Sequence, residues 1–279
     1  MKKIKYIVLS CLLASIFVSC ELFQLDNYAA PAETIKGEVI DVATGDPVLT
    51  DGGNPNQGIR IRLQQWDWKE TAIPSTFDIP CMRDGTYLNT KIFKGYYSIR
   101  ADGPFIPLIR LNQKGDTIVN GLKYVEIQGV TEVKFEVQPF LKIEWVGNPT
   151  IDAASGKITA SFKVTRAVSP ADFKAAIEPM GGYSDAFLNV TDVNLYVSES
   201  AYVGNNESYP GNNTNPYSVA YKYSGNAFES LLGQTLTFTS NAVPKGRTVF
   251  IRVGARINYV TEGQARYNYN EAKRIDMPQ

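Results

Sequence analysis

Side chains able to do covalent chemistry are few in this chain. None of the 279 residues is histidine, so neither a Ser-His-Asp triad nor a Cys-His pair nor a His-ligated metal site can form. Cys81 is the one cysteine beyond residue 20, which leaves no internal disulfide and no multi-cysteine zinc site. Paired carboxylates could still hydrolyse glycosides, but nearly all Asp and Glu residues fall in turns or on the polar side of alternating strands. The sequence therefore predicts no enzyme, no cofactor and no metal, with a structural calcium between Asp41 and Asp51 left open.

Aromatic side chains are better candidates for function, because the flat C–H faces of sugars stack on Trp and Tyr rings. Period-2 alternation from Ile59 places Trp66 and Trp68 on the polar face of a strand. If that strand stays regular, both indoles point outward about 7 Å apart and form a glycan-binding platform. The alternative is that the strand ends or bulges at Gln64 and Gln65, so that the indoles cover the edge of the sheet.

A second candidate site is the polar, Asn-rich segment 204–217, which is long for a connection in a compact domain. Its tyrosines could stack on a sugar, and its amides could pair with hydroxyl groups. The predicted glycan-binding residues here are Tyr202, Tyr209, Tyr217, Asn212 and Asn213. The alternative is a solvated hairpin tip that binds nothing.

The N-terminus carries the pattern of a bacterial lipoprotein signal. Three lysines precede an apolar run, Ile7–Val18, which has the length of a signal h-region and is too short to span a bilayer. Ser19 and Cys20 follow as a loose lipobox, so residues 1–20 are predicted to be the signal peptide and Cys20 the lipid attachment site. Two or more acyl chains hold a soluble domain firmly on a membrane. An ordinary secretory signal, in which Cys20 is incidental, is the alternative.

Charge argues against nucleic acid as a partner. Lys and Arg number 28, as do Asp and Glu, and removing the three lysines of residues 1–20 leaves 25 against 28, a net charge of −3. A near-neutral balance provides no electrostatic attraction to a polyanion.

The elements that must position these residues are β-strands. Alternation of apolar and polar residues recurs along the chain, for example over residues 59–63, 133–137, 158–164 and 249–259, with Gly- and Asp-containing turns between the runs. One short helix is predicted to start at Ser169-Pro170 and to end by Ile177. The sequence thus predicts an all-β fold of two tandem β-sandwiches.

We predict a tether over residues 21–33 and two domains, 34–139 and 140–279. No Gly- or Ser-rich linker separates the domains, so they are expected to be docked against each other.

Two stretches of the first predicted domain resemble a known type of sandwich. Residues 35–48 (IKGEVIDVATGDPV) resemble the opening of carboxypeptidase-regulatory-like, transthyretin-type domains. Residues 84–87 (DGTY) and 95–99 (GYYSI) fit the same pattern. The second domain, with Arg252–Arg256 on its long strand, looks like an immunoglobulin or fibronectin-III-like module.

Over nearly its whole length the chain resembles a two-domain lipoprotein family of unknown function from gut Bacteroidetes. Those lipoproteins occur in polysaccharide-utilisation loci beside SusC-like porins and SusD-like glycan-binding proteins. The resemblance implies a lipid-anchored protein of the outer membrane, at the cell surface, in a glycan-acquisition context. It supplies no site residues.

The sequence therefore favours a cell-envelope lipoprotein that binds a polysaccharide or oligosaccharide and assists a SusC/SusD-like uptake system. Its aromatic patch is expected far from the lipid end. The alternative is a non-enzymatic structural or assembly partner of an outer-membrane complex, without carbohydrate affinity. A glycan-cleaving enzyme would instead need two carboxyl groups about 5–10 Å apart in one cleft.

Overall fold

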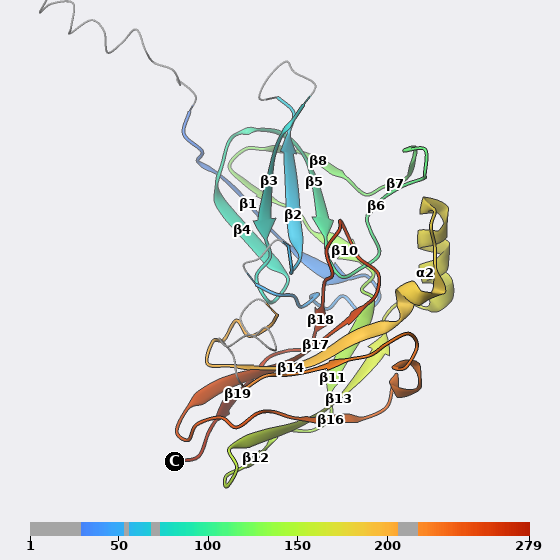
Figure 1. Ribbon diagram of the computed structural model, residues 1–279. Coiled ribbons are helices and arrows are strands. Elements are labelled where there is room, and N and C mark those ends of the chain that lie inside the picture. The colour runs from blue at the N-terminus through green and yellow to red at the C-terminus, as the bar shows by residue number, and fades with distance from the viewer. Residues whose placement is uncertain (1–28, 53–55, 68–72, 206–216) are drawn as a thin grey trace, which may run out of the picture.

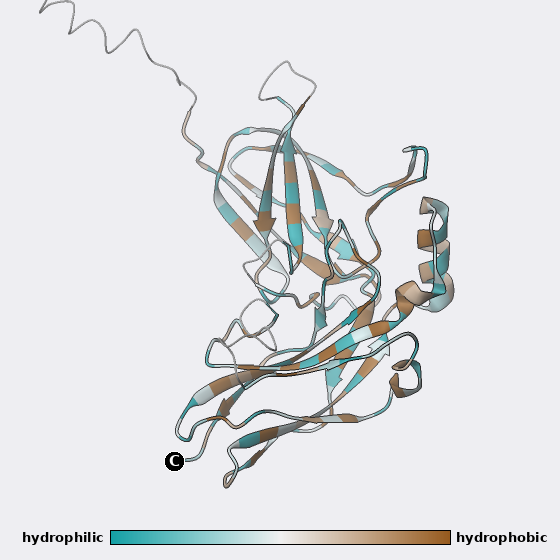
Figure 2. Cartoon of the chain, viewed as in Figure 1, coloured by the Kyte–Doolittle hydropathy of each residue, from teal (hydrophilic) through white to brown (hydrophobic). Residues whose placement is uncertain are grey.

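The alternating runs form short strands in a computed structural model that describes residues 29–52, 56–67, 73–205 and 217–279 (Figure 1). Hydrophobic and hydrophilic bands alternate along most of these strands, as Figure 2 shows, so one face of each sheet is turned toward a core. Strands β14(Val190–Ser198) and β17(Thr248–Ile257) are buried on both faces. The prediction of an all-β fold built of sandwiches is confirmed. Within the described part of the chain, no helix has the length and apolar character needed to cross a membrane.

Two sheets pack face to face in the N-terminal half, residues 33–139. The first has the order β3(Ser75–Pro80), β2(Arg60–Gln65), β5(Gly95–Asp102), β8(Lys123–Ile127), with antiparallel neighbours. In the second, β1(Glu33–Asp41) pairs with β4(Thr86–Ile92) on one side and with β9(Val130–Glu132) and β10(Phe135–Val137) on the other. A small hairpin, β6(Ile109–Leu111) and β7(Thr117–Asn120), stands beside them.

The core between these sheets is drawn from inward-facing residues such as Ile61 and Tyr97. Cys81 is fully buried within it, and burial raises the pKa of its thiol far above the ordinary value. This cysteine therefore acts as a small core residue.

A second pair of sheets makes up the C-terminal half, residues 140–279. In one, β13(Lys157–Arg166) pairs with β11(Leu141–Trp145), β12(Thr150–Asp152) and β16(Leu236–Thr239). In the other, β14(Val190–Ser198) lies between β15(Val219–Lys222) and β17(Thr248–Ile257), and β17 also pairs with β18(Asn268–Tyr269) and β19(Lys273–Asp276).

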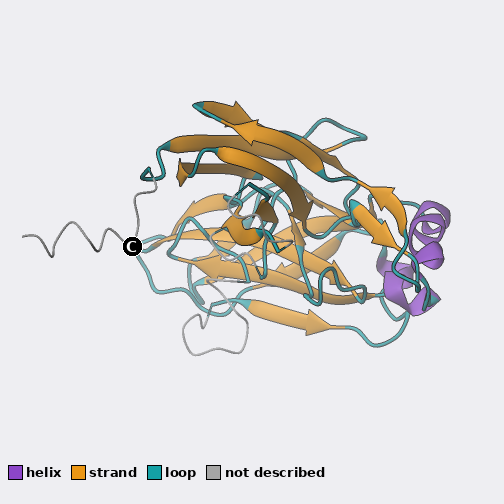
Figure 3. Cartoon of the chain, turned by 90° about the horizontal axis from the view of Figure 1, so that it is seen from above, coloured by secondary structure: helices purple, strands orange, loops and turns teal. Residues whose placement is uncertain are grey.

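Helices lie together at one end of the molecule, outside the sheets (Figure 3). The helix α2(Pro170–Ile177) has the predicted bounds, because Ser169 caps it by accepting a 3.0 Å hydrogen bond from the backbone N–H of Asp172. Short 3₁₀ turns follow at η1(Glu178–Met180), η2(Asp185–Leu188) and η3(Glu229–Leu231).

The hydrophobic residues gather into two main clusters, one from residues 35–137 and one from residues 140–277 together with Ile106. This separation supports, as a proposal, the division of the chain into domains 34–139 and 140–279.

A seam of buried polar contacts joins the two halves. Arg252 of β17 donates to the backbone oxygens of Asn270 and Thr50, each at 2.8 Å, and to that of Arg83 at 3.3 Å. Thr50 and Arg83 belong to the N-terminal half, so one guanidinium ties both halves together. The Tyr269 hydroxyl also crosses the seam and donates to the carboxylate of Asp51. The halves are therefore docked, as the missing linker predicts.

Tyrosine burial at this seam predicts sensitivity to alkali. Burial raises the pKa of Tyr196 and of Tyr269 well above the ordinary 10.0. A pKa raised by folding contributes stability that is fully present below pH 10 and is lost as the pH rises past it. Unfolding by urea at pH 8 and pH 10.5 will show a marked loss of stability in the wild type. Tyr269→Phe will be less stable than the wild type at pH 8, but its free energy of unfolding will fall less between pH 8 and pH 10.5. An equal fall in both proteins would show that Tyr269 does not cause the sensitivity to alkali.

Candidate functional site

Trp66 lies directly after β2 and faces outward, as its alternation with Gln64 predicts. Its side chain is 44% exposed. The indole Nε1 donates a 2.9 Å hydrogen bond to Ser98 of β5, and the Trp66 backbone N–H donates to the Tyr96 carbonyl at 3.0 Å. The strand itself ends at Gln65, as the alternative interpretation predicted, but the indole still lies over the outer face of the sheet.

Two tyrosines lie on the same outer face. Tyr96 of β5 is 46% exposed and Tyr124 of β8 is 49% exposed. Their rings are nearly parallel, with an interplanar angle of 18° and centroids 6.2 Å apart. The hydrogen bond from the Trp66 backbone N–H to the Tyr96 carbonyl makes these two residues neighbours across the strands. We call Trp66, Tyr96 and Tyr124 the aromatic platform.

Sequence reasoning missed Tyr96 and Tyr124, although a signal was present. Inward-facing Tyr97 and Ile99 alternate with Tyr96, and inward-facing Ile127 has the opposite parity to Tyr124. Each tyrosine could thus be placed on an outer face. Their meeting with Trp66 depends on the order β2-β5-β8, which no local pattern reveals.

Hydrogen-bonding groups surround the platform. Asp67 fixes the start of β5 by accepting a 2.9 Å bond from the Tyr96 backbone N–H. Glu126 is the register partner of Tyr96 on β8 and is exposed. Gln64 stands on the next row of the face and donates to the Thr76 hydroxyl at 3.4 Å. Rings flanked by carboxylates and an amide suit a ligand with flat apolar faces and hydroxyl edges.

Farther along the same face, toward the seam, three arginines are paired with three carboxylates. Arg62 binds Asp78 through two hydrogen bonds of 2.8 and 2.9 Å. Burial alone would raise the pKa of Asp78, but the hydrogen bond and charge of Arg62 lower it below its ordinary value. The other two ion pairs join Arg60 to Asp102 at 2.7 Å and Arg100 to Glu262 at 2.8 Å. The pairing holds the charged end of the face in one arrangement.

The structure does not bring the other predicted residues to Trp66. Tyr202 is 57% exposed and lies beside Gly52, near the start of β2. Trp66 is at the opposite end of that six-residue strand, roughly 20 Å away. Tyr217 packs, partly buried, against the core of the C-terminal half. Trp68, Tyr209, Asn212, Asn213 and Cys20 lie outside the described residues.

The aromatic platform lies at the end of the N-terminal sandwich where the described chain begins. Glu33, where β1 begins, pairs with Ile92, three residues before Gly95 of β5. The backbone N–H of Thr34 donates to Gly129, just after β8. The patch therefore lies at the end where the chain arrives from its N-terminus. The expectation of a patch far from the lipid end stays a prediction, because Cys20 lies outside the described residues.

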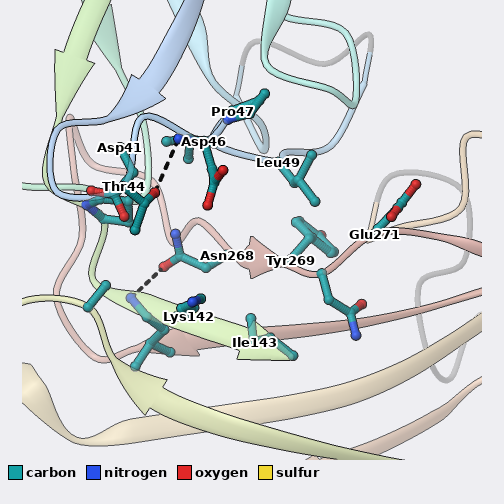
Figure 4. A pocket seen from close by; sticks show the side chains of 15 residues that line it. Asp41, Thr44, Asp46, Pro47, Leu49, Lys142, Ile143, Asn268, Tyr269 and Glu271 are labelled. Atoms are coloured by element: carbon teal, nitrogen blue, oxygen red, sulfur yellow. Dashed lines mark hydrogen bonds between the residues drawn. The ribbon is translucent and has the colours of Figure 1, made fainter. Parts of the chain in front are cut away.

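A pocket of about 170 Å³ opens between the two halves (Figure 4). Its polar groups mostly maintain structure. Thr44 accepts from the Asp46 N–H and fixes a turn, while Asn268 accepts from Leu141 and donates to the Pro104 carbonyl. The pocket is therefore part of the seam, and we do not take it as the functional site. Among the described residues, no three acidic or cysteine side chains are grouped to hold a metal ion.

Comparison with known proteins places the chain in a family. No family model and no curated protein matches the sequence. A crystal structure of a DUF3823 family protein from Bacteroides uniformis matches with 47% identity and a TM-score of 0.81, over 89% of this chain and 100% of that one. The chain belongs to the DUF3823 family.

More distant structures share the DUF3823 fold. A DUF3823 family protein from Parabacteroides merdae matches with 18% identity and a TM-score of 0.57, over 89% of this chain and all of that one. A Bacteroides uniformis protein, provisionally described as a carbohydrate binding protein, matches with 17% identity and a TM-score of 0.60, over 88% of this chain and all of that one. These two likenesses concern the fold alone.

Proposed function

We propose that this DUF3823 protein binds glycan on its aromatic platform. The observation that carries the proposal is the grouping of three half-exposed aromatic rings on one outer sheet face, with hydrogen-bonding groups around them. Soluble proteins rarely gather exposed aromatics without a partner for them. The name of the similar Bacteroides uniformis protein is in keeping with this function.

Affinity electrophoresis of residues 21–279 through gels that contain single polysaccharides tests the proposal. We expect at least one polysaccharide to retard the wild type and not Trp66→Ala. Tyr202→Ala, which removes an exposed ring near the seam, is the matched control and will be retarded like the wild type. Retardation by no polysaccharide would contradict the proposal.

An assembly role without carbohydrate affinity is the second candidate. It is favoured by exposed Met82 and Leu88, which line one shallow recess beside β4. Among the described strands, β4 pairs with β1 alone, so its other edge is open to a partner strand. A protein that passes every polysaccharide gel unretarded but co-purifies with an outer-membrane protein would fit this role.

We further propose that Cys20 carries the lipid, and that the protein acts at the outer membrane, at the cell surface, beside SusC/SusD-like uptake proteins. Cys20→Ala will move the full-length protein from the membrane fraction to the soluble fraction, because acyl chains supply the membrane affinity. Immunoblots of fractionated cells measure this change. Cys81→Ala is the control and will stay in the membrane fraction. A Cys20→Ala protein that stays there too would refute the anchor.

A further inference from the structure

The charges beside the aromatic platform differ from those farther along the same face. Asp67 and Glu126 flank Tyr96, one through its backbone N–H and one as its register partner. Glu126 takes part in none of the ion pairs found among the described residues. Carboxylate charge therefore lies next to the rings that would carry a ligand.

The three arginines described on this face are already paired with carboxylates. Arg60, Arg62 and Arg100 each lie within 2.7–2.8 Å of a partner oxygen, and their side chains are mostly covered. Moving Arg62 to a ligand would leave Asp78 without its two-bond partner, which is costly for a half-buried carboxylate.

Among the described residues, two lysines lie near the platform in sequence, and they do not outweigh its carboxylates. Lys123 of β8 turns to the opposite face, where its Nζ donates to the Lys134 carbonyl at 2.6 Å and lies 5.4 Å from the centre of the Phe135 ring. Lys94 lies in the turn before Gly95. Its single positive charge is outnumbered by the two negative charges of Asp67 and Glu126.

We infer that the platform selects a neutral polysaccharide over one that carries carboxylates or sulfates; this inference rests on the proposed glycan-binding function. Hydroxyl groups can donate to Asp67 and Glu126 as charge-assisted hydrogen bonds. A uronate or sulfate would instead meet like charge as both groups lose water, and the described part of the face offers it no uncommitted arginine.

Affinity gels in two matched sets test the inference. The neutral set is pullulan, galactomannan and mixed-linkage β-glucan, and the acidic set is polygalacturonate, alginate and chondroitin sulfate. We expect retardation by at least one neutral polymer and by no acidic one, changed less than about twofold between low salt and 0.15 M salt, because no ion pair with the ligand is screened.

Retardation by an acidic polymer that Trp66→Ala abolishes would overturn the inference and leave glycan binding intact. Retardation by no polymer of either set would remove both proposals together.

Reversing one charge provides a gain-of-function test. Glu126→Lys places a cation beside Tyr96 and will create salt-sensitive retardation by polygalacturonate. Glu136→Lys makes the same change of net charge on β10 of the other sheet and is the matched control. Migration is measured relative to a gel without polysaccharide, so that net charge cancels. Equal gains by both variants, or a gain by neither, would show that Glu126 does not set this selectivity.

Discussion

Truncating all three platform rings, as Trp66→Ala, Tyr96→Ala and Tyr124→Ala together, will abolish retention on any polysaccharide that retains the wild type. Stacking on the exposed rings supplies most of the apolar contact that this open face can offer. Loss of a central aromatic anchor typically costs about 2 kcal/mol or more, which is more than tenfold in affinity. The single variants will rank with Trp66→Ala as the most damaging, because the indole is the largest ring.

Conservative variants separate stacking from structural effects. Tyr96→Phe and Tyr124→Phe keep the rings and will stay within about twofold of the wild type. Trp66→Phe has a smaller ring and loses the hydrogen bond to Ser98, so its affinity will lie between those of the wild type and Trp66→Ala. Isothermal titration with an oligosaccharide of the retained polymer measures the affinities, and circular dichroism checks the fold. Full binding by the triple variant would contradict the platform.

Arg252→Leu will lower the free energy of unfolding by about 3–5 kcal/mol, because three buried carbonyl oxygens lose their hydrogen-bond donor. The guanidinium is 2% exposed and satisfies carbonyl oxygens of Asn270, Thr50 and Arg83. Each carbonyl left buried without a donor costs roughly 1–3 kcal/mol. The ring of Tyr269 also loses the cation 4.3 Å from its centre.

Urea unfolding of the wild type and variants measures this loss. Arg252→Lys will not restore stability, because an ammonium group lacks the planar fork that reaches all three oxygens. Arg247→Leu is the control. Arg247 is exposed just before β17, and its one ion pair within the described part of the chain is with exposed Glu199, so its removal will cost less than about 1 kcal/mol. A similar, small loss for both variants would mean that the seam adds little to stability.

The sequence predicts a structural feature correctly when all the residues that determine it lie within a single strand or helix. Alternation around Ile61 gives the inward and outward faces of β2 and the outward direction of Trp66, and the Ser169-Pro170 pair gives the start of α2. The platform needs side chains from three strands to meet. That depends on strand order and register, which are set by the packing of the whole sheet.

The role of Arg252 is equally remote from local patterns. On the sequence it is one residue of a long alternating strand. In the structure it donates to Thr50, 202 residues earlier in the chain. Burial of a cation among carbonyl groups from both halves is a property of the docked pair, so neither half alone predicts it.

The arrival of the chain beside the aromatic platform has a geometric consequence for a protein anchored at Cys20. The twelve residues from 21 to 32 can extend at most roughly 40 Å, so the platform end of the molecule would stay within about that distance of the bilayer. The C-terminus lies at the opposite extremity of the molecule (Figure 1). The second sandwich would then project away from the bilayer, and a bound sugar chain would be held on the membrane side of the molecule.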